Sequence, residues 1–187
     1  MRPEQTLLEE LKKQEKSLPP RDEEGRCIIN MCVKNDDDFL SPFSATDTPV
    51  ISPEVAEFVE DSTCLFPPNE QFVLRIKSNC IDDTEKELYQ SAFREYYTHK
   101  YIANDRELRR RRKLAWAMGT VGVLVLALAV FLEYRFGSLI WAECIDIVAW
   151  VFIWEAVYTE QFDNRKRRLQ KRSYLSYLSM EIQFYPL

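Results

Sequence analysis

Hydrophobic and polar positions alternate in three short segments of the chain, at residues 27–33, 72–77 and 178–184. Alternation with a period of two is typical of a β-strand that turns one face toward a core. An isolated strand is not stable in water, so we expect the three segments to join one sheet. The strand near the C-terminus would then complete a sheet that the first two strands begin.

Helical patterns separate these segments. Residues 3–17 carry leucines on one side of a short helix, and Ser52 with Pro53 forms a typical helix start. Thr84 and Glu87 have the spacing of a capping box at the start of a longer helix. Neither proline nor glycine follows until Gly119, so we expect that helix to continue through a basic cluster into an apolar segment.

Two apolar segments of 21 residues each, 114–134 and 138–158, dominate the second half of the chain. About 20 apolar residues are needed for a helix to cross the hydrocarbon core of a bilayer. Three residues, 135–137, connect the segments, which predicts a tight antiparallel hairpin of two transmembrane helices. A helical hairpin buried in a soluble protein is the competing interpretation, but it needs covering helices that this sequence does not offer.

Charge is divided unevenly along the chain. Residues 1–105 hold 22 acids and 12 bases, whereas residues 106–187 hold 8 acids and 13 bases. Six bases precede the first apolar segment, six follow the second, and Arg135 alone lies in the connection. The positive-inside rule therefore predicts a multi-pass protein of the plasma membrane with both termini in the cytoplasm. The residues that we expect to set this topology are Arg109, Arg110, Arg111, Arg112, Lys113, Arg165, Lys166, Arg167 and Arg168.

These patterns predict a small cytosolic α+β domain, with about three strands and two to three helices, on a two-helix transmembrane hairpin. Because the third strand follows the hairpin, the two chain ends must lie on the same side of the membrane, which agrees with the charges. The predicted parts are a cytosolic domain (1–105), a basic juxtamembrane helix (106–113), two spans (114–134 and 138–158) joined by an external loop (135–137), a basic segment (159–173) and a C-terminal strand segment (174–187).

The second apolar segment contains Glu143, Asp146 and Glu155. An acid near the centre of a membrane helix costs about 2.5–3.5 kcal/mol on insertion scales. Glu143 is close to the loop, where Arg135 could pair with it, and Glu155 is one turn from the cytoplasmic end. Asp146 lies about 12 Å into the segment at ~1.5 Å per residue. It either fixes packing, as a neutral acid or through a bond to Arg135 or Tyr134, or it forms a proton site, a cation site or an oligomer contact.

Small residues recur on one face of the first apolar segment, at Ala115, Gly119, Gly122 and Ala129. Small side chains allow close approach of a second helix. The second segment of the same chain and a helix from another copy are both candidate partners, so a homo-oligomer remains an alternative.

The sequence shows no catalytic signature. It lacks a nucleotide-binding glycine loop, a nucleophile elbow and a metal-binding histidine pair, so we expect no enzyme activity and no cofactor. The five cysteines are expected to be reduced thiols. A zinc site from Cys27, Cys32, Cys64 and Cys80 is the alternative, but Cys64 and Cys80 lack the usual two-to-four-residue knuckle spacing. We therefore expect no metal. The acidic first half also argues against a nucleic-acid partner.

Three segments, residues 40–43 (LSPF), 77–83 (KSNCIDD) and 140–147 (IWAECIDI), together resemble uncharacterised short two-pass membrane proteins of anaerobic Gram-positive bacteria. The resemblance implies a bacterial inner membrane and transfers no activity. We expect a membrane-anchored interaction or sensing module whose partners are the lipid bilayer and a cytosolic protein or small ligand. Residues 35–49, with acids at 36–38, are long enough to form a binding loop. The alternative is an oligomerising membrane effector or an ion- or proton-conducting protein.

Overall fold

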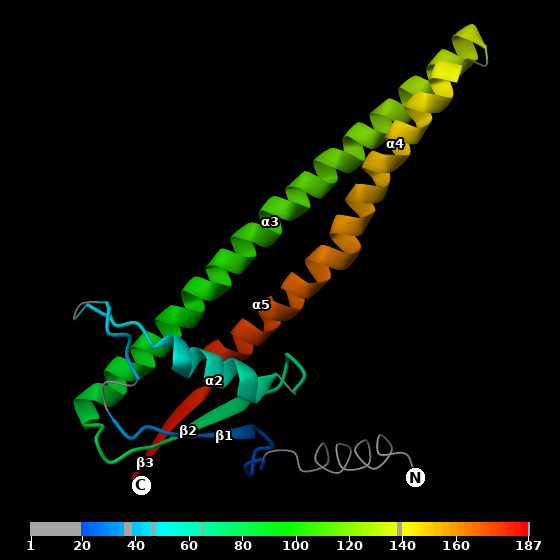
Figure 1. Cartoon of the computed structure of the whole chain (residues 1–187). Helices are drawn as coiled ribbons and strands as arrows, with labels where there is room; N and C mark the ends of the chain where they lie inside the picture. Colours follow the sequence, from blue (N-terminus) through cyan, green and yellow to red (C-terminus); the bar gives the residue numbers. More distant parts are fainter. Residues whose placement is uncertain (1–19, 36–38, 46–47, 65, 138–139, 187) are drawn as a thin grey trace, which may run out of the picture. The chain divides into compact units, whose positions relative to one another are not determined.

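A computed structural model describes residues 20–35, 39–45, 48–64, 66–137 and 140–186 of the chain (Figure 1). The predicted helix at residues 3–17 and the acidic run at 36–38 lie outside these residues. The chain divides into two compact units, residues 1–97 with 176–187 and residues 98–175. The elements are β1 (Cys27–Cys32), α2 (Pro53–Thr63), β2 (Phe72–Lys77), α3 (Asp83–Phe136), α4 (Ile140–Tyr158), the π-helical turn η2 (Thr159–Asp163), α5 (Asn164–Leu178) and β3 (Glu181–Tyr185).

The first unit is a small α+β domain around a parallel sheet with the strand order β1-β2-β3. Cys27 is paired with Phe72, and Val73 with Glu181, so the C-terminal strand joins β2 within the same chain. The prediction that three strands form one sheet is confirmed. The third strand begins at Glu181 instead of Leu178, because α5 continues to Leu178 before the chain turns.

One face of the sheet carries the core of this unit. Leu74 and Ile76 of β2 are fully buried. Tyr97 of α3 donates a hydrogen bond to the carbonyl oxygen of Ala56 in α2 at 3.4 Å, and its ring lies 4.9 Å from that of Tyr177. The hydroxyl groups of Thr63 and Tyr177 are 2.8 Å apart and share a hydrogen bond. Contacts from α2, α3 and the end of α5 therefore close the core.

Local signals predicted one helix start correctly and placed another two residues too late. Ser52 accepts a hydrogen bond from the backbone N–H of Val55 and caps α2, as predicted. The predicted capping box of Thr84 and Glu87 is wrong. Glu85 instead accepts a hydrogen bond from the backbone N–H of Asp82 at 2.8 Å, so the helix starts two residues earlier.

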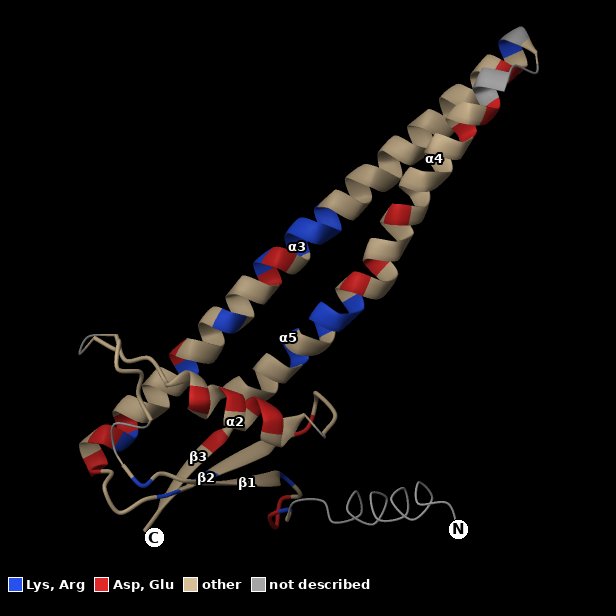
Figure 2. Cartoon of the chain, in the orientation of Figure 1, with Lys and Arg blue, Asp and Glu red and all other residues tan. Residues whose placement is uncertain are grey.

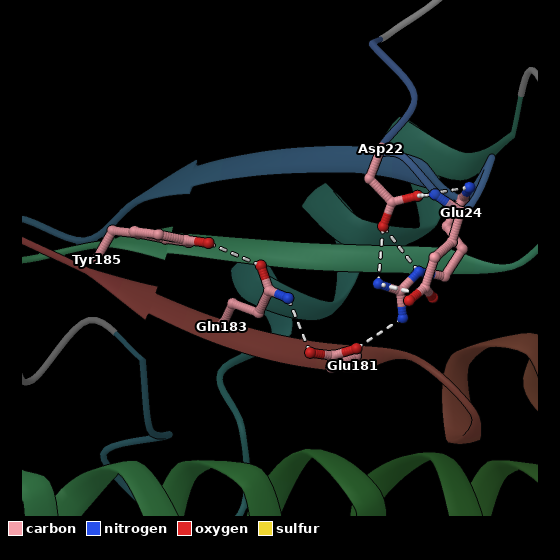
Figure 3. A network of polar contacts seen from close by, with 6 residues as sticks. Asp22, Glu24, Glu181, Gln183 and Tyr185 are labelled. Atoms are coloured by element: carbon pink, nitrogen blue, oxygen red, sulfur yellow. Dashed lines mark hydrogen bonds and ion pairs between the residues drawn. The ribbon is translucent and has the colours of Figure 1, made fainter.

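The opposite face of the sheet carries a polar network that holds the C-terminal strand (Figure 3). Arg26 bonds to Asp22 at 2.7 Å and to Glu181 of β3 at 2.6 Å. Gln183 donates to Glu181, and the Tyr185 hydroxyl donates to Gln183. The hydrogen bonds from Gln183 and Arg26 lower the pKa of Glu181. The network links the segment before β1 to the last strand, so residues more than 150 positions apart stabilise the same sheet.

The second unit is a helical hairpin. It contains most of α3, then α4, η2 and most of α5, and α3 is continuous from Asp83 to Phe136 as the sequence predicted. Gly137 ends α3 with a positive φ of 80°, a conformation that favours glycine, and its N–H donates to the carbonyl oxygen of Glu133. After α4, the turn η2 joins the apolar helix directly to α5, so the predicted basic segment (159–173) is helical in the structure.

Candidate functional site

Close packing between α3 and α4 centres on two glycines. A Cβ atom at Gly122 would lie 2.7 Å from Cγ1 of Ile153 and 3.1 Å from the carbonyl oxygen of Ala149. A Cβ atom at Gly119 would lie 3.5 Å from Cβ of Ala156, which is an ordinary contact. Glycine at position 122 therefore allows the two helix backbones to approach closely.

Three alanines extend this contact along the hairpin. Ala115 and Ala129 of α3 are each 4% exposed, and Ala149 of α4 is fully buried. The small residues that the sequence placed on one face of α3 thus lie at the level where α4 packs. The second segment of the same chain occupies that face.

The outer surface of the hairpin is strongly apolar. Within the described part of residues 114–158, sixteen large hydrophobic side chains are exposed: Leu114, Trp116, Val121, Val123, Leu124, Leu128, Val130, Phe131, Tyr134, Ile147, Val148, Trp150, Val151, Trp154, Val157 and Tyr158. Figure 2 shows that charged residues gather along the lower part of α3 and along α5, while most of the upper hairpin has none. Exposed patches of this extent mark surfaces that contact lipid or another protein.

Among the described residues, one helix is long and apolar enough to cross a membrane. It covers Asp83–Arg135, and only 17% of its most apolar window is buried. The core helix of a soluble protein with the same composition would be mostly buried. The helix α4 has 19 residues, and the side chains of its first three lie outside the description.

The base of the hairpin, below the apolar surface, is held by paired charges. Asp105 of α3 is 9% exposed and accepts hydrogen bonds from Lys171 of α5 at 2.5 Å and from Arg109 at 2.7 Å. The bond from Lys171 is the main reason that the pKa of Asp105 is lowered, and the same bond raises the pKa of Lys171. Both groups are therefore charged at neutral pH and join α3 to α5.

A second set of charges lies nearer to the apolar surface. Arg111 donates to Glu107 at 2.8 Å and to Asp163 of η2 at 3.4 Å. The bond from Arg111 lowers the pKa of Glu107. Arg167 approaches Glu107 only to 4.0 Å, and its guanidinium therefore keeps free hydrogen-bonding capacity.

The π-helical turn brings a buried polar group into this base. Asn164 is fully buried and donates to Glu160 at 2.7 Å, while its Oδ1 atom has no hydrogen-bond partner among the described residues. Glu160 also pairs with Arg168. On α3, Asn104 donates to the carbonyl oxygen of Arg167 at 3.0 Å. Turns of this kind are frequent at functional sites, and this one lies where the apolar helix gives way to the basic helix.

Beside this turn the surface forms a recess of about 460 Å³, which we call the basal pocket. Its lining contains three bases and one acid together with an aromatic ring and an amide: Arg111, Lys166, Arg167, Asp163, Phe162 and Gln170. The lining therefore carries more positive than negative charge, which favours an anion over a cation there.

The structure does not bring the three predicted membrane acids together. Glu143 and Glu155 are exposed and Asp146 is half-buried on α4. Within the described residues, none of the three makes a side-chain hydrogen bond or ion pair. Gly122 of α3 faces Ile153 of α4, and the two helices run antiparallel. Two helical turns further toward the loop, the same register places Asp146 level with Ala129. Arg135 is exposed at the end of α3, and its pairing with Glu143 or Asp146 stays a prediction.

The predicted topology-setting bases all lie on the lower part of α3 or on α5. Sequence reasoning missed the acids that organise them. Asp105 and Glu107 flank Arg106 at the start of the basic run, and these interruptions were the available signal. No sequence signal pointed to Asn164 or to the π-helical turn.

The described cysteines are free thiols, with Cys27 buried and Cys32, Cys64, Cys80 and Cys144 exposed. In the part of the chain that the structure describes, no group of three or more His, Cys, Asp or Glu side chains is arranged to hold a metal ion. No protein-family model, curated protein or solved structure matches this chain.

Proposed function

We propose that the chain is a membrane-anchored interaction or sensing module, in which a two-pass hairpin holds the α+β domain at the cytoplasmic face of the plasma membrane. The observation that carries the proposal is the exposed apolar surface of the hairpin. Fully burying a large apolar side chain contributes about 1.5–3 kcal/mol, so a half-exposed one leaves roughly 1 kcal/mol unrealised in water. Sixteen such side chains amount to on the order of 15 kcal/mol, as much as the whole stability of a typical domain. Lipid removes this cost.

The sheet supports an even number of membrane crossings. β2 precedes the hairpin and β3 follows it, yet the two strands are hydrogen-bonded neighbours in one sheet. If α3 crosses a bilayer, α4 has to cross back before β3 can pair with β2. This argument is independent of charge and agrees with the basic residues on both sides of the hairpin, which favour the cytoplasm.

The sheet face of the first unit supports the interaction role. A recess of about 410 Å³ lies there, lined by residues that include Arg26, Arg75, Gln183 and Tyr185. The Nε atom of Arg75 is buried and has no hydrogen-bond partner among the described residues, although its guanidinium lies 5.7 Å from the ring centre of Tyr185. A buried donor without an acceptor is costly, so an acceptor on a small ligand or on a cytosolic protein would be favoured there.

Cysteine labelling tests the topology with the chain's own thiols. Cys32, Cys64 and Cys80 are exposed in the first unit. In a Cys144→Ser background, a membrane-impermeant maleimide added to intact spheroplasts should leave these three unlabelled until the membrane is permeabilised. Adding Ser138→Cys should introduce one site that is labelled from outside. Labelling of the native thiols in intact cells, or recovery of the full chain in the supernatant without detergent, would refute the proposal.

An oligomerising membrane effector that conducts ions or protons is the second candidate. It is favoured by the acids of α4, which have no side-chain partner among the described residues, and by an apolar groove of about 520 Å³ along the hairpin that includes Ala115, Gly119 and Ala156. Induced expression with a membrane-potential dye separates the two candidates. An effector should depolarise the cells and lose this effect with Asp146→Asn, whereas an anchored module should leave the potential unchanged.

A further inference from the structure

We propose that the basal pocket binds the phosphate of one anionic phospholipid at the cytoplasmic face of the membrane. This inference rests on the proposed insertion of the hairpin. The pocket is formed by the π-helical turn and α5 on one side and by Arg111 of α3 on the other, within a single unit.

The bases of the pocket are only partly neutralised by the protein, because Arg111 pairs with Glu107 at 2.8 Å while Arg167 approaches the same carboxylate only to 4.0 Å. Its lining holds Arg111, Lys166 and Arg167 against the one carboxylate of Asp163. Asp163 is bonded to Arg111 at 3.4 Å, and Lys166 makes no side-chain hydrogen bond or ion pair within the described residues. A phosphodiester carries one negative charge and accepts several hydrogen bonds, so it matches the donors that remain on Lys166 and Arg167.

The cations around Asp105, by contrast, are paired within the protein. Asp105 binds both Lys171 and Arg109, so the cations there already have a partner. Unpaired positive charge therefore remains at the level of the π-helical turn, directly after the last residues of the apolar helix. That is the depth at which lipid phosphates are found when the hairpin spans a bilayer.

An aromatic pair on the apolar side of the pocket indicates a lipid instead of a free phosphate ion. Phe162 lines the pocket, is 65% exposed, and stacks on Tyr158 with ring centres 5.3 Å apart. Tyr158 ends α4, and Trp154, one turn earlier, is also exposed. Acyl chains that leave a phosphate in the pocket would lie along these rings, which a soluble phosphate compound would not use. Asp163 and Gln170 can then accept hydrogen bonds from headgroup hydroxyl groups, as in a glycerol headgroup.

The test compares two adjacent bases of the same cluster. Arg165 and Lys166 are both exposed and both lack a side-chain partner among the described residues, but Lys166 alone of the two lines the pocket. Full-length protein is purified in detergent and reconstituted in nanodiscs of phosphatidylcholine with or without phosphatidylglycerol. Native mass spectrometry counts the lipids that the protein retains. We expect one retained phosphatidylglycerol, about fivefold weaker retention in Lys166→Gln, about 30-fold weaker in Lys166→Gln/Arg167→Gln, and unchanged retention in Arg165→Gln.

Each other outcome counts against the pocket. Equal retention of both lipids by the wild-type protein would show that the pocket has no preference for the anionic lipid. An equal loss in Arg165→Gln and Lys166→Gln would show that diffuse surface charge, and not the basal pocket, retains the lipid. If inorganic phosphate stabilised the protein against heat as much as the anionic lipid does, the ligand of the pocket would be a soluble phosphate and not a lipid. Melting in phosphatidylcholine alone shows whether a variant is folded. Failure of the membrane proposal is distinguishable, because the chain would then remain soluble without detergent and enter no nanodisc.

Discussion

The contact between Gly122 and α4 gives the sharpest quantitative prediction. Replacing Gly122 by alanine introduces a Cβ atom 2.7 Å from Cγ1 of Ile153 and 3.1 Å from two backbone atoms, the carbonyl oxygen of Ala149 and the amide nitrogen of Ile153. Ile153 can rotate its side chain, but the backbone atoms cannot move without separating the helices. Overpacking of this kind costs about 1–3 kcal/mol.

Gly119→Ala is the matched control. It makes the same chemical change in the same helix, and its new Cβ atom meets Ala156 at an ordinary 3.5 Å. Alanine is favoured over glycine in a helix by up to about 1 kcal/mol, and this term is common to both variants. The difference in unfolding free energy between Gly119→Ala and Gly122→Ala therefore isolates the steric term, about 1–3 kcal/mol. For a chain of this length that corresponds to about 2–12 °C in melting temperature.

The assay is thermal unfolding of the full-length protein in detergent, followed by size-exclusion chromatography of the soluble fraction. Gly119→Ala should melt at or above the wild-type temperature, and Gly122→Ala should melt below it. Adding Ile153→Ala to Gly122→Ala should recover the part of the loss that comes from Cγ1, with a coupling energy of about 0.5–3 kcal/mol. Equal melting temperatures for the two glycine variants would show that α4 does not pack on this face.

Two further predictions concern charged contacts in the two units. Because the pKa of Asp105 is lowered from its ordinary 3.8 and that of Lys171 is raised from 10.5, their bond stabilises the hairpin base between these values. The melting temperature should fall as the pH drops below about 4 or rises above about 10. Asp105→Asn should make both falls smaller. An unchanged fall of the melting temperature at acidic pH in this variant would contradict the prediction. Arg26→Ala should release Glu181 and so speed amide hydrogen exchange in β3, measured by mass spectrometry. Lys34→Ala, on the exposed surface, is the control and should leave this exchange unchanged. Equal exchange in both variants would refute the role of the network.

Much of the first unit was readable from its sequence because its signals are local. A period of two identified the three strands, and Ser52 with Pro53 identified the start of α2. Strand order, parallel direction and register depend on neighbours that alternation does not encode. The same limit explains the error at residues 178–180, where the alternation extends into the last turn of α5 and Tyr177 packs against Tyr97.

The long apolar helix was readable for a different reason, since an apolar segment with a basic flank needs no tertiary information. The base of the hairpin was not. Asp105 and Lys171 are 66 positions apart, and their contact depends on the register between α3 and α5. The π-helical turn shifts that register, and intrinsic propensity does not predict where a turn of this kind occurs.

The position of the small residues limits how two copies of the chain could associate. Gly122 and the buried alanines of α3 face α4 of the same chain, so that face is occupied before any second copy approaches. A dimer contact would have to use the outer faces, where large apolar side chains and Glu155 are exposed. An acid in lipid favours a partner that supplies a donor, whereas apolar side chains in lipid gain little from association because lipid is as apolar as a second helix. Any oligomer in the membrane should therefore depend on an acid of α4 more than on the small residues of α3.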